Sequence, residues 1–561
     1  MTPRKPLFFL SSLLVAYSLA NNSPKHSSDK TASLPVHEEL IAQLRETDAV
    51  IPPAPEGLPR GNMSNREAVI PPQCYTRHDQ TYNACYVCHQ ASIPGRENVM
   101  NDDDLQADYS FSDVGLANHW KNLFEDRSSR VEKITDEEIT NYVNEDNYSE
   151  LAGRLKEAEF KGWIPELANL QLGAEAFDEQ GFAKDGSQWV AFQYKPFPST
   201  FWPTNGATDD VMIRLAEPFR SNQEGSPCAD TYRANLAIVE ANLKGLSEIT
   251  CLPVDEKAVG EDLNGDGKLT TIHKVTRINQ YVGSASKDRI ETHLYPAGTE
   301  FLHTVRYLGI DDKGQIQPST RMKEVRYMKK WRAYSKPVYG RQYELEGFEK
   351  EAGNLPAYMN LREHGLDNGN GWSISGFIES YNGRLRALTH EENFSCMGCH
   401  NSIGSTIDKT FSFPRKVDGA AGWGYLDLKG MPDVPTQGEQ KGEIATYLER
   451  VGGGSEFRHN PEMLERWFKP DGSVDHEKIA QAKDVYELIT PSRERALMLN
   501  KAYKCIVEDQ DYIYGKDATV VPPKNVFQQV DNETTESLPA DKQYRWNILL
   551  DWNRPPSLSQ K

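Results

Sequence analysis

The sequence predicts an α+β fold in which mostly helical segments at both ends flank a large mixed, strand-containing middle region. Two Cys-x-x-Cys-His pentapeptides, residues 85–89 and 396–400, mark the two ends, and their spacing fits one helical turn. Residues 136–143 have the acidic, periodic pattern of a surface helix, as do residues 148–160. From residue 189 onward an aromatic, proline-rich texture indicates strands and tight loops in the middle region.

The N-terminus has the pattern of a signal peptide over residues 1–20. Arg4 and Lys5 precede an apolar run over residues 7–19, which ends in small residues at Ala20. We expect export to the periplasm or the cell exterior, with no membrane span after cleavage. An uncleaved anchor is the alternative, although the run is short for a span. No cysteine follows Ala20 directly, so nothing in this pattern suggests a lipoprotein.

The two pentapeptides have the spacing of a covalent haem attachment site. Two thiols one helical turn apart add to the two vinyl groups of a porphyrin, and the adjacent histidine ligates its iron. Cys85, Cys88, Cys396 and Cys399 would form the thioethers. A structural zinc site and a thioredoxin-like pair are the alternatives, but neither explains both copies with histidine following directly.

With these motifs the chain resembles a two-haem c-type cytochrome. The resemblance implies two covalently attached haem c groups, with His89 and His400 as proximal iron ligands. Met431, in Lys429-Gly430-Met431-Pro432, resembles the distal methionine of small c-type cytochromes. The other distal candidates are histidines and one methionine, namely His78, Met100, His303, His364 and His390.

The length predicts two to four domains. The predicted segments are a linker or wrapping arm over residues 21–71, an N-terminal haem segment over 72–130, a mixed middle region over 131–385 and a cytochrome c-like haem region over 386–561. Only residues 37–45 of the arm show helical periodicity. In the middle region, alternation over residues 292–307 around Pro296-Ala297-Gly298 predicts a β-hairpin.

The net charge and the length of the chain limit the classes of function that we expect. The net charge of −19 becomes −21 once Arg4 and Lys5 leave, which argues against nucleic acid as a partner. Because two fused small cytochromes need only about 200 residues, the surplus favours a redox enzyme with one haem open to a small oxidant or substrate. The alternatives are an electron-transfer protein that docks to a redox partner and a secreted binding protein with structural haems. The oligomeric state is open.

Residues 262–273 resemble the calcium loop of an EF-hand. Oxygen donors recur at alternate positions, which suits a hard cation, and the glycine at position 267 permits the sharp turn. The twelfth position is His273 where the family has glutamate, so Glu256 or Glu261 would have to close the site. The alternative is a solvated turn without an ion. The candidate calcium ligands are Asp262, Asn264, Asp266, Lys268 and Thr270.

Four cysteines lie outside the pentapeptides. In an oxidising compartment they predict two disulfides among three connectivities, and we favour Cys228–Cys251 and Cys74–Cys505. Four free thiols are the alternative.

Overall fold

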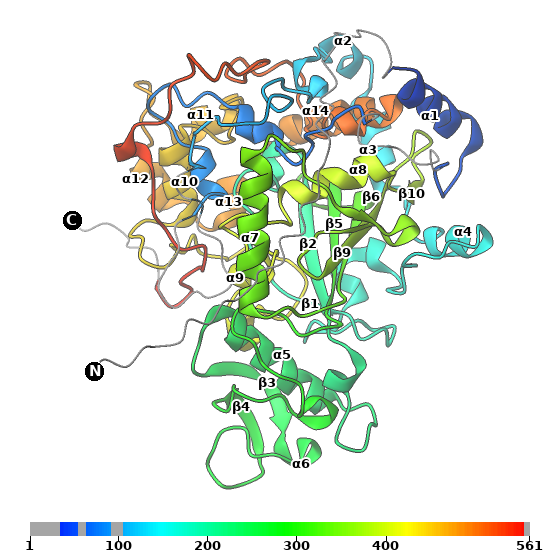
Figure 1. Ribbon diagram of the computed structural model, residues 1–561, viewed down its shortest axis with the longest axis vertical. Helices are drawn as coiled ribbons and strands as arrows, with labels where there is room; N and C mark the ends of the chain where they lie inside the picture. The colour runs from blue at the N-terminus through cyan, green and yellow to red at the C-terminus, as the bar shows by residue number, and fades with distance from the viewer. Residues whose placement is uncertain (1–33, 54–62, 91–101, 103–104, 555–561) are drawn as a thin grey trace, which may run out of the picture.

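The computed structural model describes residues 34–53, 63–90, 102 and 105–554. An antiparallel sheet in the order β1-β2-β5-β6-β9-β8-β7, with β10 paired to β9, forms its centre, and β3 and β4 form a separate pair (Figure 1). The expected mixed α+β class is therefore confirmed. The strands are β1 (Val190–Ala191), β2 (Thr208–Arg214), β3 (Ile249–Asp255), β4 (Thr271–Val275), β5 (Glu300–Ile310), β6 (Ile316–Lys330), β7 (Met359–Asn360), β8 (Leu366–Asp367), β9 (Trp372–Glu379) and β10 (Leu385–Ala387).

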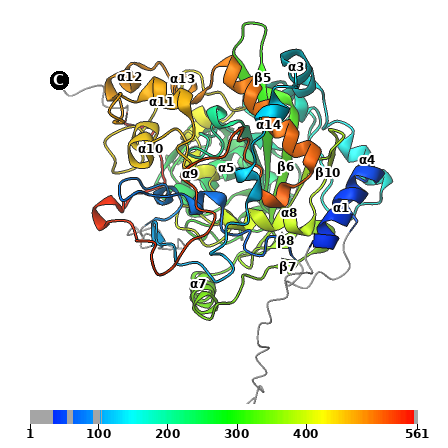
Figure 2. The same ribbon diagram turned by 90° about the horizontal axis from the view of Figure 1, so that it is seen from above.

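Helices surround this sheet. Helices α3 and α14 pack on β5, on the same side of the sheet (Figure 2). Helices α5 and α6 join β3 and β4 at the lower end of the molecule in Figure 1. The helices are α1 (Leu34–Thr47), α2 (Ser128–Val131), α3 (Asp136–Asn144), α4 (Leu151–Glu157), α5 (Ala229–Lys244), α6 (Glu256–Val259), α7 (Lys336–Glu351), α8 (His390–Phe394), α9 (Ser412–Arg415), α10 (Glu443–Val451), α11 (Pro461–Trp467), α12 (His476–Gln481), α13 (Val485–Ile489) and α14 (Arg493–Asp509).

The long hairpin of the sheet lies later in the chain than the sequence pattern predicts. Residues 292–299 form a loop, and the turn joins β5 to β6 over residues 311–315. The Asp311 carboxylate accepts hydrogen bonds from the backbone N–H groups of Lys313 and Gln315, and Gly314 has φ +75°. These side-chain bonds define the turn, so the hairpin predicted around Pro296 is wrong.

The side chains of β5 and β6 point alternately to the two faces of the sheet, which have different surroundings. Phe301 and His303 of β5 and Arg326 of β6 face a chamber on one side of the sheet. Leu302 and Val325 point the other way, into a hydrophobic core cluster. This period of two is what a strand imposes on its side chains. The sheet is therefore one wall of the chamber.

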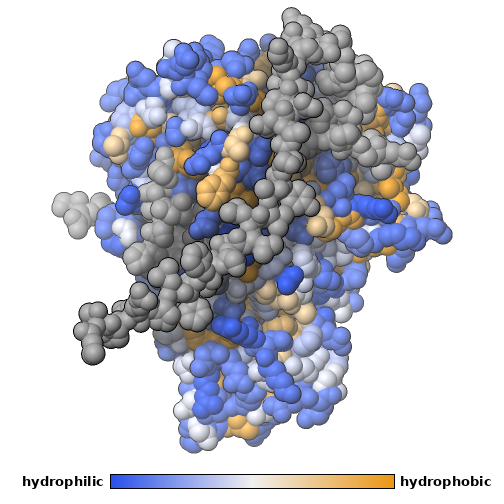
Figure 3. All heavy atoms as spheres, viewed as in Figure 1, coloured by the Kyte–Doolittle hydropathy of each residue, from blue (hydrophilic) through white to orange (hydrophobic). Residues whose placement is uncertain are grey.

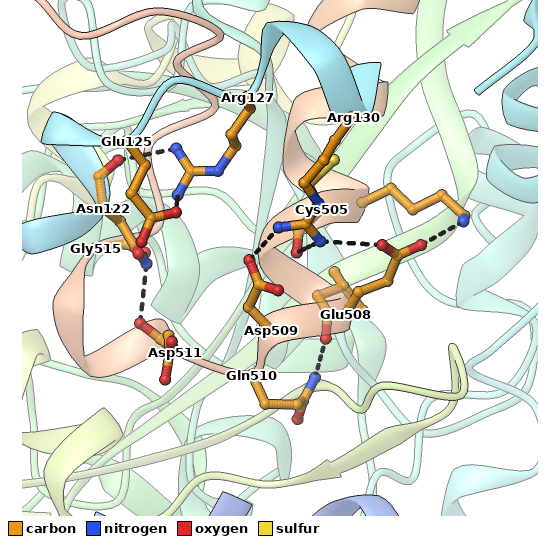
Figure 4. Close-up of polar contacts among 12 residues, drawn as sticks. Asn122, Glu125, Arg127, Arg130, Cys505, Glu508, Asp509, Gln510, Asp511 and Gly515 are labelled. Atoms are coloured by element: carbon orange, nitrogen blue, oxygen red, sulfur yellow. Dashed lines mark hydrogen bonds and ion pairs between the residues drawn. The ribbon is translucent and has the colours of Figure 1, made fainter. Parts of the chain in front are cut away.

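A polar cluster connects residues 122–130 to the C-terminal end of α14 (Figure 4). Arg130 bonds Glu508 and Asp509, at 3.1 and 2.6 Å, and also the backbone carbonyl of Cys505. Asn122 donates to the carbonyl of Gly515 at 2.8 Å. Because residues 515–518 line the chamber, this cluster positions another part of its wall.

The face of the molecule in Figure 3 is largely hydrophilic. Within the described residues, no helix combines the length and the apolar character that crossing a bilayer requires. The predicted signal peptide lies outside those residues.

Candidate functional site

The two pentapeptides adopt the same backbone turn. The N–H groups of Cys88 and His89 both donate to the carbonyl of Cys85, at 3.2 and 3.0 Å. In the second motif the N–H groups of Cys399 and His400 donate to the carbonyl of Cys396, at 3.2 and 3.1 Å. Each motif thus folds into one short helical turn with its two thiols three residues apart.

The two turns lie side by side although they are far apart in the sequence. The N–H of Ser405, just after the second motif, donates to the carbonyl of Cys88 at 3.0 Å. The buried Asp102 carboxylate accepts the N–H groups of Gln90 and Gly404, at 2.7 and 2.8 Å. Asp102 therefore joins the segment after the first motif to the segment after the second.

Each motif histidine has an oxygen close to its Nδ1, but among the described residues only Nδ1 of His400 makes a hydrogen bond. His89 Nδ1 lies 3.2 Å from Asp102 Oδ2, and His400 Nδ1 lies 2.9 Å from the carbonyl oxygen of Lys409. Neither Nε2 has a hydrogen-bond partner among the described residues. Burial lowers the pKa of His400 to about 4, so its imidazole is neutral at neutral pH. A neutral imidazole fixed through Nδ1 is the form that ligates a metal through Nε2.

Both turns open into one chamber of about 2030 Å³ of atom-free space, counted with its part open to solvent. The four motif cysteines and both histidines line it, together with Cys74. Aromatic side chains form much of the remaining wall, including Phe197 and Phe201 from the aromatic, proline-rich stretch of the sequence. Trp202 of the same stretch is fully buried against Tyr447. The chamber thus has the apolar lining and few polar groups of a cofactor site.

Polar groups on the sheet face the motifs. His303 of β5 pairs directly with Arg326 of β6, and His303 Nε2 lies 3.2 Å from Asp209. Glu324 accepts from Nε and Nη2 of Arg326, at 2.9 and 3.1 Å, and from Lys516 at 3.1 Å. Burial alone would raise the pKa of Glu324, but Arg326 and Lys516 hold it well below its ordinary range. Arg326 and Lys516 are therefore two fixed cations in the wall of the chamber.

The motif thiols are protonated in this environment. Burial raises the pKa of Cys85 and of Cys399 to about 11. All eight cysteines lie in the described part of the chain, and none is in a disulfide there.

Both expected disulfides are therefore wrong. Cys74 lies in the chamber wall, whereas Cys505 is buried on α14 in a separate hydrophobic cluster. Cys251 is buried in the core, and the Cys228 thiol lies 3.9 Å from the carbonyl of Ala258.

Most of the expected distal iron ligands lie elsewhere. Met431 is buried in the hydrophobic core, and its backbone carbonyl accepts from Val485; it is absent from the described lining of the chamber. His78 stacks on Tyr109, and its Nε2 lies 2.8 Å from the carbonyl of Glu536.

Of the remaining candidates, His303 lies in the chamber. His364 and His390 are not part of the described lining. Met100 falls outside the described residues.

The loop over residues 262–273 is organised by hydrogen bonds. Asp262 accepts the N–H groups of Gly265 and Gly267, at 2.7 and 2.9 Å. Buried Glu256 accepts three further loop amides, from Leu263, Asn264 and Thr270. No group of three or more His, Cys, Asp or Glu side chains in the described residues is arranged to hold a metal ion. Calcium in this loop stays a prediction.

Sequence reasoning missed Asp102, Arg326, Glu324 and Lys516. No spacing or motif distinguishes them, because each reaches the site only through the long-range pairing of the fold.

The fold and the site define a protein with two matched thiol-histidine turns on a single chamber beside an antiparallel sheet. A family model described as "-like lipoprotein" matches residues 59–488, so the chain belongs to this lipoprotein family. An "Uncharacterized lipoprotein" of Aquifex aeolicus (strain VF5) is 31% identical over 550 residues, which cover 87% of this chain and 92% of the relative. No solved structure matches.

These comparisons correct the assignment to the c-type cytochromes. The matching family and the relative are both lipoproteins, so the expectation that nothing suggests a lipoprotein is also wrong. The di-haem redox enzyme and the electron-transfer protein depend on that assignment, so both expectations are wrong. The physical reason is that a pentapeptide encodes a local turn and its chemistry. The fold around it, here a sheet shared by both motifs, is encoded elsewhere.

Proposed function

We propose that the chamber covalently holds haem, with one group at each pentapeptide. Cys85 and Cys88 would form the thioethers of one haem, and Cys396 and Cys399 those of the other. His89 and His400 would ligate the two irons through Nε2. Covalent attachment requires only the local turn and an accessible porphyrin site, so this proposal does not depend on a cytochrome family.

One observation supports this proposal above all. Two separate turns have the same backbone hydrogen bonds, each places an oxygen close to Nδ1 of its histidine, and both open into one apolar chamber. A single shared metal ion would instead need three or four side chains converging on one point. Haem iron, when bound, would supply ligand binding or electron transfer at the sites that His89 and His400 hold.

The residues of this chain would orient and shield the groups. The Lys409 carbonyl holds the His400 imidazole, which raises its basicity toward a metal, and the Asp102 carboxylate lies 3.2 Å from Nδ1 of His89. His303 is the one proposed distal candidate within the described lining of the chamber. In this proposal one haem is attached to the segment over residues 72–130 and one to the region over 386–561, and both haems lie in the shared chamber. Export of the chain is consistent with the lipoprotein description of its family.

The proposal is tested by producing the chain for export together with a haem-attachment system. Purified protein is denatured, separated by size and stained for haem. We expect stain at the position of the full chain, and half of it in each double variant, Cys85→Ala with Cys88→Ala or Cys396→Ala with Cys399→Ala. Removing Cys228 and Cys251 is the matched control and should leave the stain unchanged. A full chain that is folded yet carries no haem contradicts the proposal.

A further inference from the structure

A second cavity adjoins the chamber. It contains about 970 Å³ of atom-free space, counted in the same way, and the two cavities share Glu456 and Asp517 in their walls. Residues that line only this outer cavity come from α14, from the segments around residues 455–461 and 519–521, and from Ser199. None of them belongs to the pentapeptides. The outer cavity is thus separate from the proposed haem site but touches its wall.

A buried, incompletely bonded arginine lines the outer cavity. Arg495 is only 8% exposed, and its Nε donates to the carbonyl of Thr204 at 2.8 Å. Its two Nη atoms make no hydrogen bond to the described residues. The Asn460 amide bonds the hydroxyl of Thr204 at 3.0 Å, which fixes the partner of Nε. A buried guanidinium with unused donors costs folding free energy unless a ligand completes its hydrogen bonds.

Among the described residues, no nearby acidic group accepts a hydrogen bond from the Nη atoms of Arg495. Glu462 attracts it, but the two Glu462 oxygens accept from the N–H and hydroxyl of Ser492, at 2.8 and 2.6 Å. Burial lowers the pKa of Arg495 to about 10, so it still carries its charge at neutral pH. The guanidinium group of Arg495 therefore lines the outer cavity, and no carboxylate of the described residues forms a hydrogen bond with it.

We propose that the outer cavity binds a small carboxylate with an apolar body, whose carboxylate pairs with Arg495. The planar guanidinium matches a carboxylate in geometry and charge. Phe457, Met498, Leu499 and Val520 give the cavity apolar walls for the rest of the ligand. The ligand would lie against the wall that the two cavities share.

The acidic residues of the shared wall determine the conditions of the test. Glu456 accepts a hydrogen bond from the Ser199 hydroxyl, and burial raises the pKa of Glu456 to about 7. Burial likewise raises the pKa of Asp517 to about 6. At pH 6 the Glu456 carboxyl is largely neutral and the Asp517 carboxyl is partly neutral, so the two repel a bound carboxylate less than they would at higher pH.

Calorimetric titration of the purified full chain with benzoate at pH 6 tests the proposal. We expect saturable binding of benzoate and none of benzyl alcohol, which has the same ring without the charge. Arg495→Gln should weaken binding by about 10- to 100-fold, the usual effect of losing a charged hydrogen-bond partner. Arg493→Gln, on the same helix at a half-exposed position, is the matched control and should change binding less than twofold. Benzoate binding that is absent, or that is unchanged in Arg495→Gln, overturns the proposal.

A second measurement covers the case in which Arg495→Gln does not fold. Phenylglyoxal modifies accessible guanidinium groups, and peptide mass mapping reports which arginines react in the wild-type chain. Benzoate should slow the modification of Arg495 and leave that of Arg493 unchanged, and equal rates with and without benzoate would refute the site. The result is independent of haem, because no motif residue takes part.

Discussion

At the scale of single residues, the proposed haem ligation depends on how two histidines are oriented. Nδ1 of His400 bonds the Lys409 carbonyl, and Nδ1 of His89 lies 3.2 Å from the Asp102 carboxylate. The sequence identifies the histidines through their pentapeptides. It does not identify Asp102, because an aspartate thirteen positions after His89 has no recognisable pattern and acts only once residue 404 has folded beside it.

Glu456 provides a prediction of pH dependence. Its pKa is about 7 in the folded chain against an ordinary 4.5, so the folded state holds more protons between these values and stability falls as pH rises. Glu456→Gln removes this loss, and its unfolding free energy should exceed that of the wild type by up to about 3 kcal/mol at pH 8. At pH 4 the two should agree.

Urea unfolding at both pH values measures this difference. Exposed Glu465→Gln is the control and should show no pH-dependent gain. Equal stability of Glu456→Gln and the wild type at pH 8 would show that burial does not perturb this carboxyl.

Calcium in the loop over residues 262–273 is tested by thermal unfolding. If the ion binds, adding calcium after chelation should raise the melting temperature, by mass action on the folded state. Asp262→Asn should lose the rise. No change in the wild type on adding millimolar calcium would mean that the hydrogen bonds of Glu256 and Asp262 suffice to hold the loop.

At the scale of elements, local patterns predicted several helices well and long-range pairing poorly. Periodicity over residues 136–143 and 37–45 corresponds to α3 and α1 in the structure. The hairpin prediction over residues 292–307 was wrong, because an alternating pattern does not locate the turn. The order of the sheet could not be predicted, since β6 pairs with β9 across the intervening α7.

Gly365 tests the junction that places β8 beside β9. It has φ +86° and ψ −137°, a conformation that side chains rarely allow, and a Cβ there would collide with the carbonyl of Ile374. Gly365→Ala should destabilise the chain by about 3 kcal/mol or more. Gly353→Ala, at φ +70° with open space around it, should cost only about 1 kcal/mol.

Chemical denaturation of both glycine variants gives the comparison. Similar losses in the two would mean that the β8–β9 junction relaxes freely.

At the scale of the whole molecule, segments far apart in the sequence meet at one chamber. The segment before the first motif, the loop after the second, β5 and β6 of the sheet, and residues 515–518 all contribute to its wall. The sequence identified the two motifs but assigned them to two separate haem regions. Only the fold places them side by side, and the family comparison corrected the class to which the chain was assigned.

Covalent haem attachment is tested most directly by an experimental structure of the exported, purified chain. Attachment at both motifs predicts density for two porphyrins in the chamber, one continuous with Cys85 and Cys88 and the other with Cys396 and Cys399, with His89 and His400 on the irons. A folded chain with a chamber that holds no porphyrin, or with a single metal ion bridging the two motifs, would contradict it.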